Sequence, residues 1–126
     1  MYTVFQIQIS DEIYDFVNSP EGGHMETAKR FPEYHASLET RLRGAEGYKP
    51  EFAKHYDAVC GIDAEDLEEV FHIGNMGPEE SIERLDRMHS VSVGDVVRDN
   101  ETGTYHMVDG MGFTQLLSFQ DQTVVA

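Results

Sequence analysis

This sequence has one cysteine, no tryptophan and few basic residues, and each scarcity excludes a class of protein. The single cysteine, Cys60, excludes an internal disulfide and a cysteine-based zinc site within one chain. The lack of tryptophan removes the usual aromatic platform for a sugar ring and argues against glycoside hydrolysis by paired carboxylates. Nine lysines and arginines against 24 acidic residues give a net charge of −15, which disfavours direct binding to nucleic-acid phosphates.

Long apolar runs are also missing. No stretch approaches the length of a membrane-spanning helix, and the opening MYTVFQIQIS lacks the basic region and apolar core of a signal peptide. We therefore expect no membrane association and a cytoplasmic location. The 126 residues are 40% hydrophobic, which suits a single domain spanning residues 1–126.

Hydrophobic periodicity predicts the elements of the first half. Residues 2–9 alternate, with Val4 and Gln6 on one face and Phe5 and Ile7 on the other, which is typical of a strand. Helical patterns and capping residues occur at the start of several later segments. We expect helices in residues 11–17, 24–31 and 32–43 and from Pro50, and a second strand in residues 56–62.

Two acidic helices are expected in the middle of the chain. The first, in DAEDLEEVFHIGN, has Asp63 as its N-cap and faces the core with Leu67, Val70 and Phe71. The second, in GPEESIERLDRM, has Pro78 in its first turn and is expected to turn its apolar side chains inward, namely Ile82 and Leu85.

The last third is typical of a small β unit. Its sequence VGDVVRDNETGTYHMVDGMGFTQLLSF predicts two strands joined by the turn DNETG, then a bend at Gly110 and Gly112 into FTQLL. The predicted fold class is therefore α+β. We expect a small, mostly antiparallel sheet, made of the N-terminal strand and the C-terminal hairpin strands, packed by four or five short helices.

Charge is concentrated in one part of the chain. Residues 57–86 hold ten carboxylates and one basic residue, Arg84. One interpretation is two solvated helix faces; the sharper one is a surface that binds a basic protein partner, host or viral, in the manner of nucleic-acid phosphates. The predicted partner-binding residues are Asp63, Glu65, Asp66, Glu68, Glu69, Glu79, Glu80, Glu83 and Asp86.

Patterns for nucleophilic, metal or phosphate chemistry are weak. Cys60 lies in a predicted strand flanked by carboxylates, which is typical of a buried structural cysteine. The six histidines lack the spacing that puts two on one helical face, and DNETG is too short for a calcium loop. In GNMGPEES, glutamates stand where a phosphate would bind. We assign no catalytic residue, no metal ligand and no cofactor.

The segments HSVSVGDVV and YHMVDGMGFTQL carry a family pattern. They resemble the C-terminal signature of YodL-like domains, in which an hSVSDVI segment precedes a strand, a turn and a YYVDSFGF strand. The departures are the inserted VG at 93–94, His106-Met107 and Gly110-Met111. The resemblance is confined to residues 82–116, the C-terminal third. The matching residues are Ser90, Val91, Ser92, Asp95, Val96, Val97, Tyr105, Val108, Asp109, Gly112 and Phe113.

This resemblance implies a phage or mobile-element setting, hence the cytoplasm of a host cell, and carries no catalytic residues. Physically, Ser90 can cap a helical turn, Gly94 permits a chain reversal and Asp95 can accept from backbone N–H groups. We interpret the signature residues as structural: Ser90, Ser92, Gly94, Asp95, Tyr105, Asp109, Gly112 and Phe113.

Three functions remain open at this stage. The favoured one is a phage- or mobile-element-encoded acidic accessory protein that binds a basic protein, as a nucleic-acid mimic or an inhibitor of a host factor. The alternative is a small enzyme, or metal-dependent accessory of nucleic-acid processing, that uses His89, Asp95 and Asp109. The third is a structural or assembly component with an exposed apolar patch. The sequence gives neither the partner nor the oligomeric state.

Overall fold

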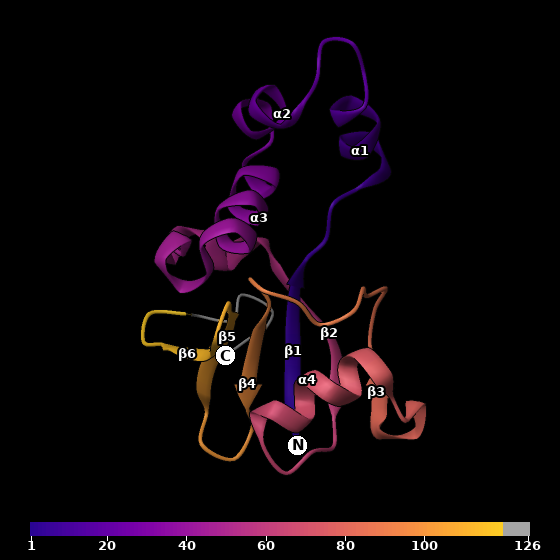
Figure 1. The fold of residues 1–126 in the computed structure, drawn as a ribbon, viewed down its shortest axis with the longest axis vertical. Helices are drawn as coiled ribbons and strands as arrows, with labels where there is room; N and C mark the ends of the chain where they lie inside the picture. The colour runs from indigo at the N-terminus through magenta and orange to yellow at the C-terminus, as the bar shows by residue number, and fades with distance from the viewer. Residues whose placement is uncertain (120–126) are drawn as a thin grey trace.

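A six-stranded antiparallel sheet organises the chain (Figure 1). A computed structural model describes residues 1–119, and within them the strand order is β3-β2-β1-β4-β5-β6, with every neighbouring pair antiparallel. The first strand in the sequence thus lies in the middle of the sheet. The strands are β1 (Tyr2–Ile7), β2 (Tyr56–Ile62), β3 (Ile82–Arg84), β4 (Val96–Asp99), β5 (Thr104–Asp109) and β6 (Gly112–Leu116).

Helices occupy one face of the sheet and the region beyond the end of β1. Figure 1 shows α4 across one face, while α1, α2 and α3 project past the point where the chain leaves β1. The α+β class with an antiparallel sheet and short helices is therefore confirmed. The helices are α1 (Asp11–Val17), α2 (His24–Arg30), α3 (Pro32–Arg43) and α4 (Leu67–Met76), with short 3₁₀ helices η1 (Gly44–Gly47), η2 (Pro50–His55) and η3 (Glu79–Ser81).

The alternation predicted for β1 divides the core in two. Val4 belongs to a cluster that α4 covers with Val70 and Ile73. Phe5 and the side chains that follow it at every second position belong to the other cluster, on the opposite face. Because both faces are covered, five of the six residues of β1 are buried, including the polar Gln6, while Thr3 is partly exposed.

Residues 77–88 do not form the predicted second acidic helix. Glu79–Ser81 makes one 3₁₀ turn, and Ile82–Arg84 then pairs with β2 as an edge strand. The unpaired backbone edge of β2 offers ladder hydrogen bonds, and these compete successfully with a helix of modest propensity. Ile82 still packs against the core, but Leu85, predicted to face inward, is 57% exposed.

The first acidic helix exists but begins later than predicted. The backbone N–H of Asp63 donates to the carbonyl oxygen of Ser81 at 3.0 Å, so the chain here is still tied to the neighbouring segment. Asp66 is the N-cap instead, and its carboxylate accepts from the N–H of Glu69 at 2.8 Å. The core-facing side chains shift accordingly: Ile73 is buried, whereas Phe71 is 41% exposed.

The predicted β unit at the C-terminal side is confirmed. β4 and β5 pair across the turn DNETG, and β5 and β6 pair across Gly110-Met111, with Asp109 opposite Gly112. The helix that ends at Gly44 is also as predicted, since this residue has a φ of 59°. Among residues 1–119, no helix has the length and apolar character needed to cross a membrane.

Candidate functional site

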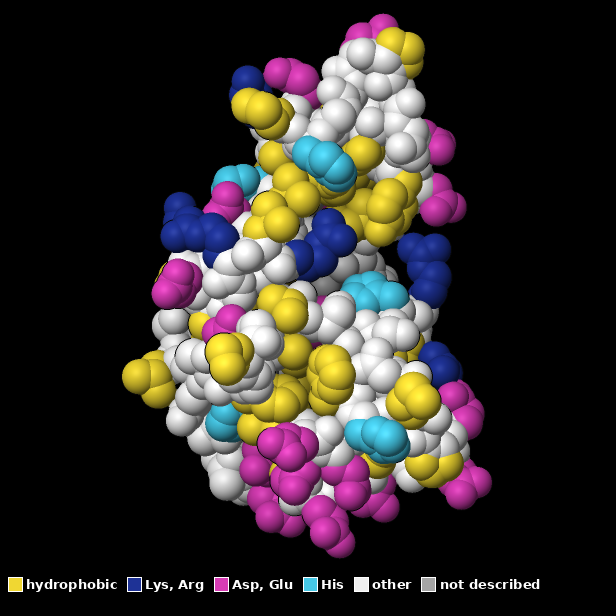
Figure 2. Space-filling view, in the orientation of Figure 1, with side chains coloured by type: hydrophobic (Ala, Val, Ile, Leu, Met, Phe, Trp, Pro, Cys, Tyr) yellow, Lys and Arg dark blue, Asp and Glu magenta, His cyan; other side chains and the backbone are white. Residues whose placement is uncertain are grey.

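All nine carboxylates predicted to bind a partner are exposed. They fall into two groups, because the second predicted helix is a turn and an edge strand. In Figure 2 acidic side chains gather at the end of the molecule that holds the start of α4. We call this surface the acidic end and define it as Asp63, Glu65, Asp66, Glu68 and Glu69 with Asp99 and Glu101. The remaining four, on η3 and β3 and just after β3, form the acidic edge: Glu79, Glu80, Glu83 and Asp86.

Asp99 and Glu101 join the acidic end from a distant part of the sequence. They belong to the end of β4 and the turn that follows it, and from the sequence they were considered only as part of the DNETG turn. Burial raises the pKa of the Tyr2 phenol, and the negative charges of Asp99, Asp66 and Glu101 raise it further. Carboxylates from both segments therefore lie close enough to Tyr2 to affect its pKa. Register explains this convergence, because Tyr2 is paired with Asp99.

A hollow of about 700 Å³ lies between these two segments. Its acidic lining comes from Asp66, Glu68 and Asp99, and Tyr2 and Phe113 contribute aromatic surface. A lysine or arginine side chain has an apolar stem and a charged head, so it matches this combination of surfaces.

Several of the predicted carboxylates have local structural roles. Asp66 caps α4, and Glu69 accepts from the N–H of Glu65 at 3.2 Å, so this pair satisfies donors at the helix start. Glu79 forms a two-bond pair with Arg84, and this hydrogen bonding lowers the pKa of the Glu79 carboxyl. The others make no such side-chain pairs with a lysine or arginine within residues 1–119.

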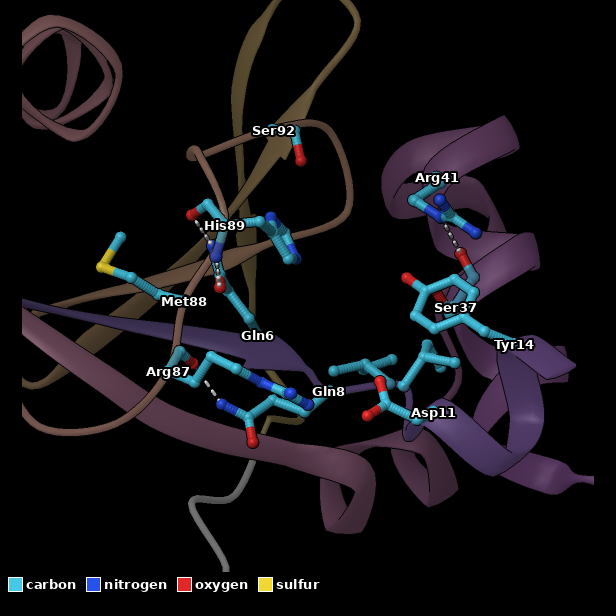
Figure 3. A pocket seen from close by; sticks show the side chains of 12 residues that line it. Gln6, Gln8, Asp11, Tyr14, Ser37, Arg41, Arg87, Met88, His89 and Ser92 are labelled. Atoms are coloured by element: carbon cyan, nitrogen blue, oxygen red, sulfur yellow. Dashed lines mark hydrogen bonds between the residues drawn. The ribbon is translucent and has the colours of Figure 1, made fainter.

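The HSVSVGDVV segment is fixed by Gln6 at the centre of the sheet (Figure 3). The Gln6 amide nitrogen donates to the carbonyl oxygen of His89 at 2.9 Å and to the Asp95 carboxylate at 3.0 Å. The Gln6 amide oxygen accepts from the N–H of His89 at 3.2 Å. Asp95 also accepts from the N–H of Ser92 at 3.0 Å, which confirms its expected use as a backbone acceptor.

Asp95 is a buried acid with a strongly shifted pKa. Burial raises the pKa of its carboxyl to about 7, against the opposing effects of His89, the Ser92 N–H, Gln6 and Arg41. Perturbed carboxyl groups of this kind are found at functional sites and in structural networks alike. Here its two hydrogen-bond partners, Gln6 and Ser92, line the neighbouring cavity, while Asp95 lies behind them.

We call this neighbouring cavity the arginine cavity. It has a volume of about 350 Å³ and lies between the start of α1, α3 and residues 87–92. Its polar lining includes Arg41, Arg87 and His89, together with Gln8 and Tyr14. Apart from His89 and Ser92, no residue that lines the cavity was identified as a candidate site or signature residue from the sequence. The only local signal is the pair of glutamines on one face of an otherwise apolar strand.

Asp109 lies apart from His89 and Asp95. Its carboxylate accepts from the N–H of Gly110 at 2.9 Å, from the Thr114 hydroxyl at 2.8 Å and from the N–H of Ala45 at 3.4 Å. These bonds lower the pKa of the Asp109 carboxyl. The residue lines a different hollow, so His89, Asp95 and Asp109 do not share one cleft.

The other signature residues have structural surroundings. The ring of Tyr105 lies 6.0 Å from that of Phe5, in the core, and Phe113 packs on the α4 side of the sheet. Gly94 has a φ of 95°, as the expected reversal requires. Ser90 and Gly112 are exposed, and the hydrogen bonds of residues 1–119 include no helix cap from Ser90.

Residues 1–119 contain no group of three or more histidine, cysteine, aspartate or glutamate side chains placed to hold a metal ion. Cys60 is fully buried in β2, and burial raises the pKa of its thiol to about 11, which suits a structural cysteine. The geometry thus leaves three surfaces to consider: the acidic end, the arginine cavity and an apolar hollow between α2 and α3.

No family model matches this chain, and no match was found among curated proteins or among solved structures.

Proposed function

We propose that this chain is a small acidic accessory protein that binds a basic protein partner through its acidic end. The observation that carries the proposal is the convergence of carboxylates from two segments: the exposed ones at the start of α4, and the half-buried Asp99 and exposed Glu101 at the β4–β5 turn. Such a surface attracts a cationic partner, speeds its encounter and favours one orientation of binding.

The carboxylates of the acidic end have no cationic partners of their own among the described residues. The three ion pairs within residues 1–119 join Lys29 to Glu26, Arg43 to Glu39 and Arg84 to Glu79. Carboxylates that form no internal ion pair can attract an incoming lysine or arginine, even where, as in Asp66 and Glu69, they also accept a backbone hydrogen bond. The hollow beside Tyr2 and Phe113 would take the apolar stem of such a side chain.

The target surface that fits best is one that normally binds nucleic acid. Proteins that bind phosphate backbones present clustered lysines and arginines, and a dense set of carboxylates can occupy the same positions. A phage or mobile-element origin, as the YodL-like resemblance implies, fits an inhibitor of a host factor of this type. The mimicry proposed here uses the start of one helix and one turn in place of two acidic helices.

The test is capture of partners from host lysate at low and high salt, followed by measurement with the purified partner. The acidic end is altered as Glu65→Gln, Glu68→Gln and Glu101→Gln, which spares the capping carboxylates of α4. A matched control changes three distant exposed carboxylates by the same charge: Glu12→Gln, Asp15→Asn and Glu21→Gln.

We expect the partner to bind wild type and the control with similar affinity, and affinity to fall steeply with salt. The altered acidic end should bind about tenfold more weakly. If both triple variants bind like wild type, or both lose affinity equally, the acidic end is not the binding surface.

A second candidate function is assembly through an apolar surface. A hollow of about 620 Å³ lies between α2 and α3, and beside it Met25 is 76% and Leu42 is 79% exposed. Exposed apolar side chains that adjoin a hollow are typical of protein contact sites. The variant Leu42→Glu separates this function from the first, because it should abolish self-association or assembly while leaving salt-dependent partner binding intact.

A further inference from the structure

Arg41 and Arg87 approach the arginine cavity from different elements (Figure 3). Arg41, on α3, donates through Nε to the carbonyl oxygen of Ser37 on its own helix at 3.4 Å. Arg87 forms hydrogen bonds through its backbone: its N–H donates to the Asp86 carboxylate, and its carbonyl oxygen accepts from the Gln8 amide. Within residues 1–119 neither guanidinium group has an ion-pair partner.

Two such arginines are notable in a chain with 24 carboxylates and nine basic residues. Arg43 and Arg84, by contrast, each pair with a glutamate. The cavity instead brings together two guanidinium groups and His89 with one carboxylate in its lining, that of Asp11. Among the lining residues, arginines thus outnumber carboxylates, which is the reverse of the balance in the chain as a whole.

The rest of the lining suits a small organic ligand. The side chains of Ile9 and Met88 provide apolar wall, and Tyr14 and Ser37 add hydroxyl groups. A volume of about 350 Å³ lies at the lower end of the range for small-molecule sites. A nucleic-acid strand is disfavoured by the net charge of −15.

We propose that the arginine cavity binds a small molecule that carries a carboxylate or phosphate group, held between Arg41 and Arg87. The planar guanidinium fork matches both anions. The apolar part of the ligand lies against Ile9 and Met88. This site is separate from the acidic end and does not depend on the partner binding proposed above.

The test uses three probes that share one ring and differ in charge, namely benzoate, phenyl phosphate and the neutral benzamide. Amide NMR spectra of the full chain are recorded at constant ionic strength. We expect saturable shifts in residues 87–92 with benzoate or phenyl phosphate and none with benzamide. The anion that binds more tightly distinguishes a carboxylate ligand from a phosphate ligand. Failure of both anions to saturate, or equal binding of benzamide, would overturn the proposal.

Charge-neutral variants locate the site. Arg41→Gln and Arg87→Gln should each weaken anion binding about tenfold. Arg43→Gln, on the same helix but outside the cavity, should leave it unchanged. Asp11→Asn should tighten binding severalfold, because it removes the carboxylate that repels the ligand. An increase in affinity cannot result from misfolding, so unchanged or weaker binding by Asp11→Asn would contradict the proposed position of the anion.

Discussion

Gly74 of α4 and Val91 of the HSVSVGDVV segment pack so closely that a Cβ atom on Gly74 would lie 2.3 Å from Val91 Cγ2. Glycine inside a helix is less favourable than alanine by about 1 kcal/mol. Gly74 therefore does not stabilise the helix itself; it allows Val91 to pack closely against α4. Val91 is buried in the same cluster as Val70 and Ile73 of α4. The contact therefore ties the helix of the acidic end to the segment that lines the arginine cavity.

Gly74→Ala should destabilise the protein by about 1–3 kcal/mol, because overpacking against Val91 outweighs the gain in helix propensity. The free energy of unfolding is measured by urea denaturation. In a Val91→Ala background the same change should cost less, since the methyl group that clashes is gone. A cost that is equal in both backgrounds would mean that Val91 is not the group that Gly74 accommodates.

A series of glycine variants separates backbone strain from steric conflict. Gly44 has a φ of 59°, and a Cβ atom there would lie 1.9 Å from the Asp109 carboxylate, which three hydrogen bonds hold in place. Gly103 has a φ of 74° with open space around it, and Gly110 has open space without a positive φ.

Alanine at Gly110 should change stability by less than about 0.5 kcal/mol, and at Gly103 by about 1 kcal/mol. At Gly44 the loss should exceed both, because strain and conflict with Asp109 add. The stabilities of the three variants are ranked by thermal and urea unfolding. A Gly44→Ala variant as stable as Gly103→Ala would show that Asp109 moves aside without cost.

Two glutamines of the N-terminal strand segment allow a matched comparison. Gln6 is fully buried and bonds to both backbone groups of His89 and to Asp95, whereas Gln8 is half-buried and bonds to the carbonyl oxygen of Arg87. Gln6→Met should cost about 2–4 kcal/mol, since it leaves buried polar groups unpaired. Gln8→Met should cost less than about 1 kcal/mol. Equal losses in urea unfolding would contradict the central role of Gln6.

The pH dependence of stability should report on Asp95. Its pKa is about 7 in the folded protein and 3.8 as the ordinary value, so the folded state binds the proton more tightly. The contribution of Asp95 to the free energy of unfolding is fully present below pH 3.8 and is lost as the pH rises through 7.

Between pH 5 and pH 8 wild type should therefore lose stability relative to Asp95→Asn, by on the order of a few kcal/mol. Asparagine keeps an acceptor for Ser92 and Gln6, which makes it a suitable control for shape. Urea unfolding at both pH values provides the measurement. Parallel pH profiles of the two proteins would contradict the raised pKa.

Local patterns predicted the elements that have a clear side-chain period or a clear stop residue. The alternation of Val4, Phe5 and Gln6, and the glycine stop at Gly44, follow from backbone geometry and side-chain period alone. The helix predicted for residues 77–88 was wrong. Pro78, Ile82 and Leu85 have helical spacing, but pairing with the free edge of β2 decided the structure. No window of sequence around these residues contains that information.

The candidate sites follow the same division. The charge of the α4 start is visible in the sequence, but its extension by Asp99 depends on pairing with Tyr2. The arginine cavity depends on residues from α3 and from the segment before His89, which are adjacent only in the fold. The role of Gln6 could not be predicted from the sequence, because its hydrogen-bond partners lie far along the chain.

The central place of β1 has a consequence for the order of events during synthesis. Residues 2–7 are synthesised before residues 96–99, which complete one side of this strand. Until then the nascent chain carries an open strand edge with Val4 and Phe5 nearby, a state that invites aggregation and slows folding. The sheet around β1 cannot close until residues 96–99 have been synthesised.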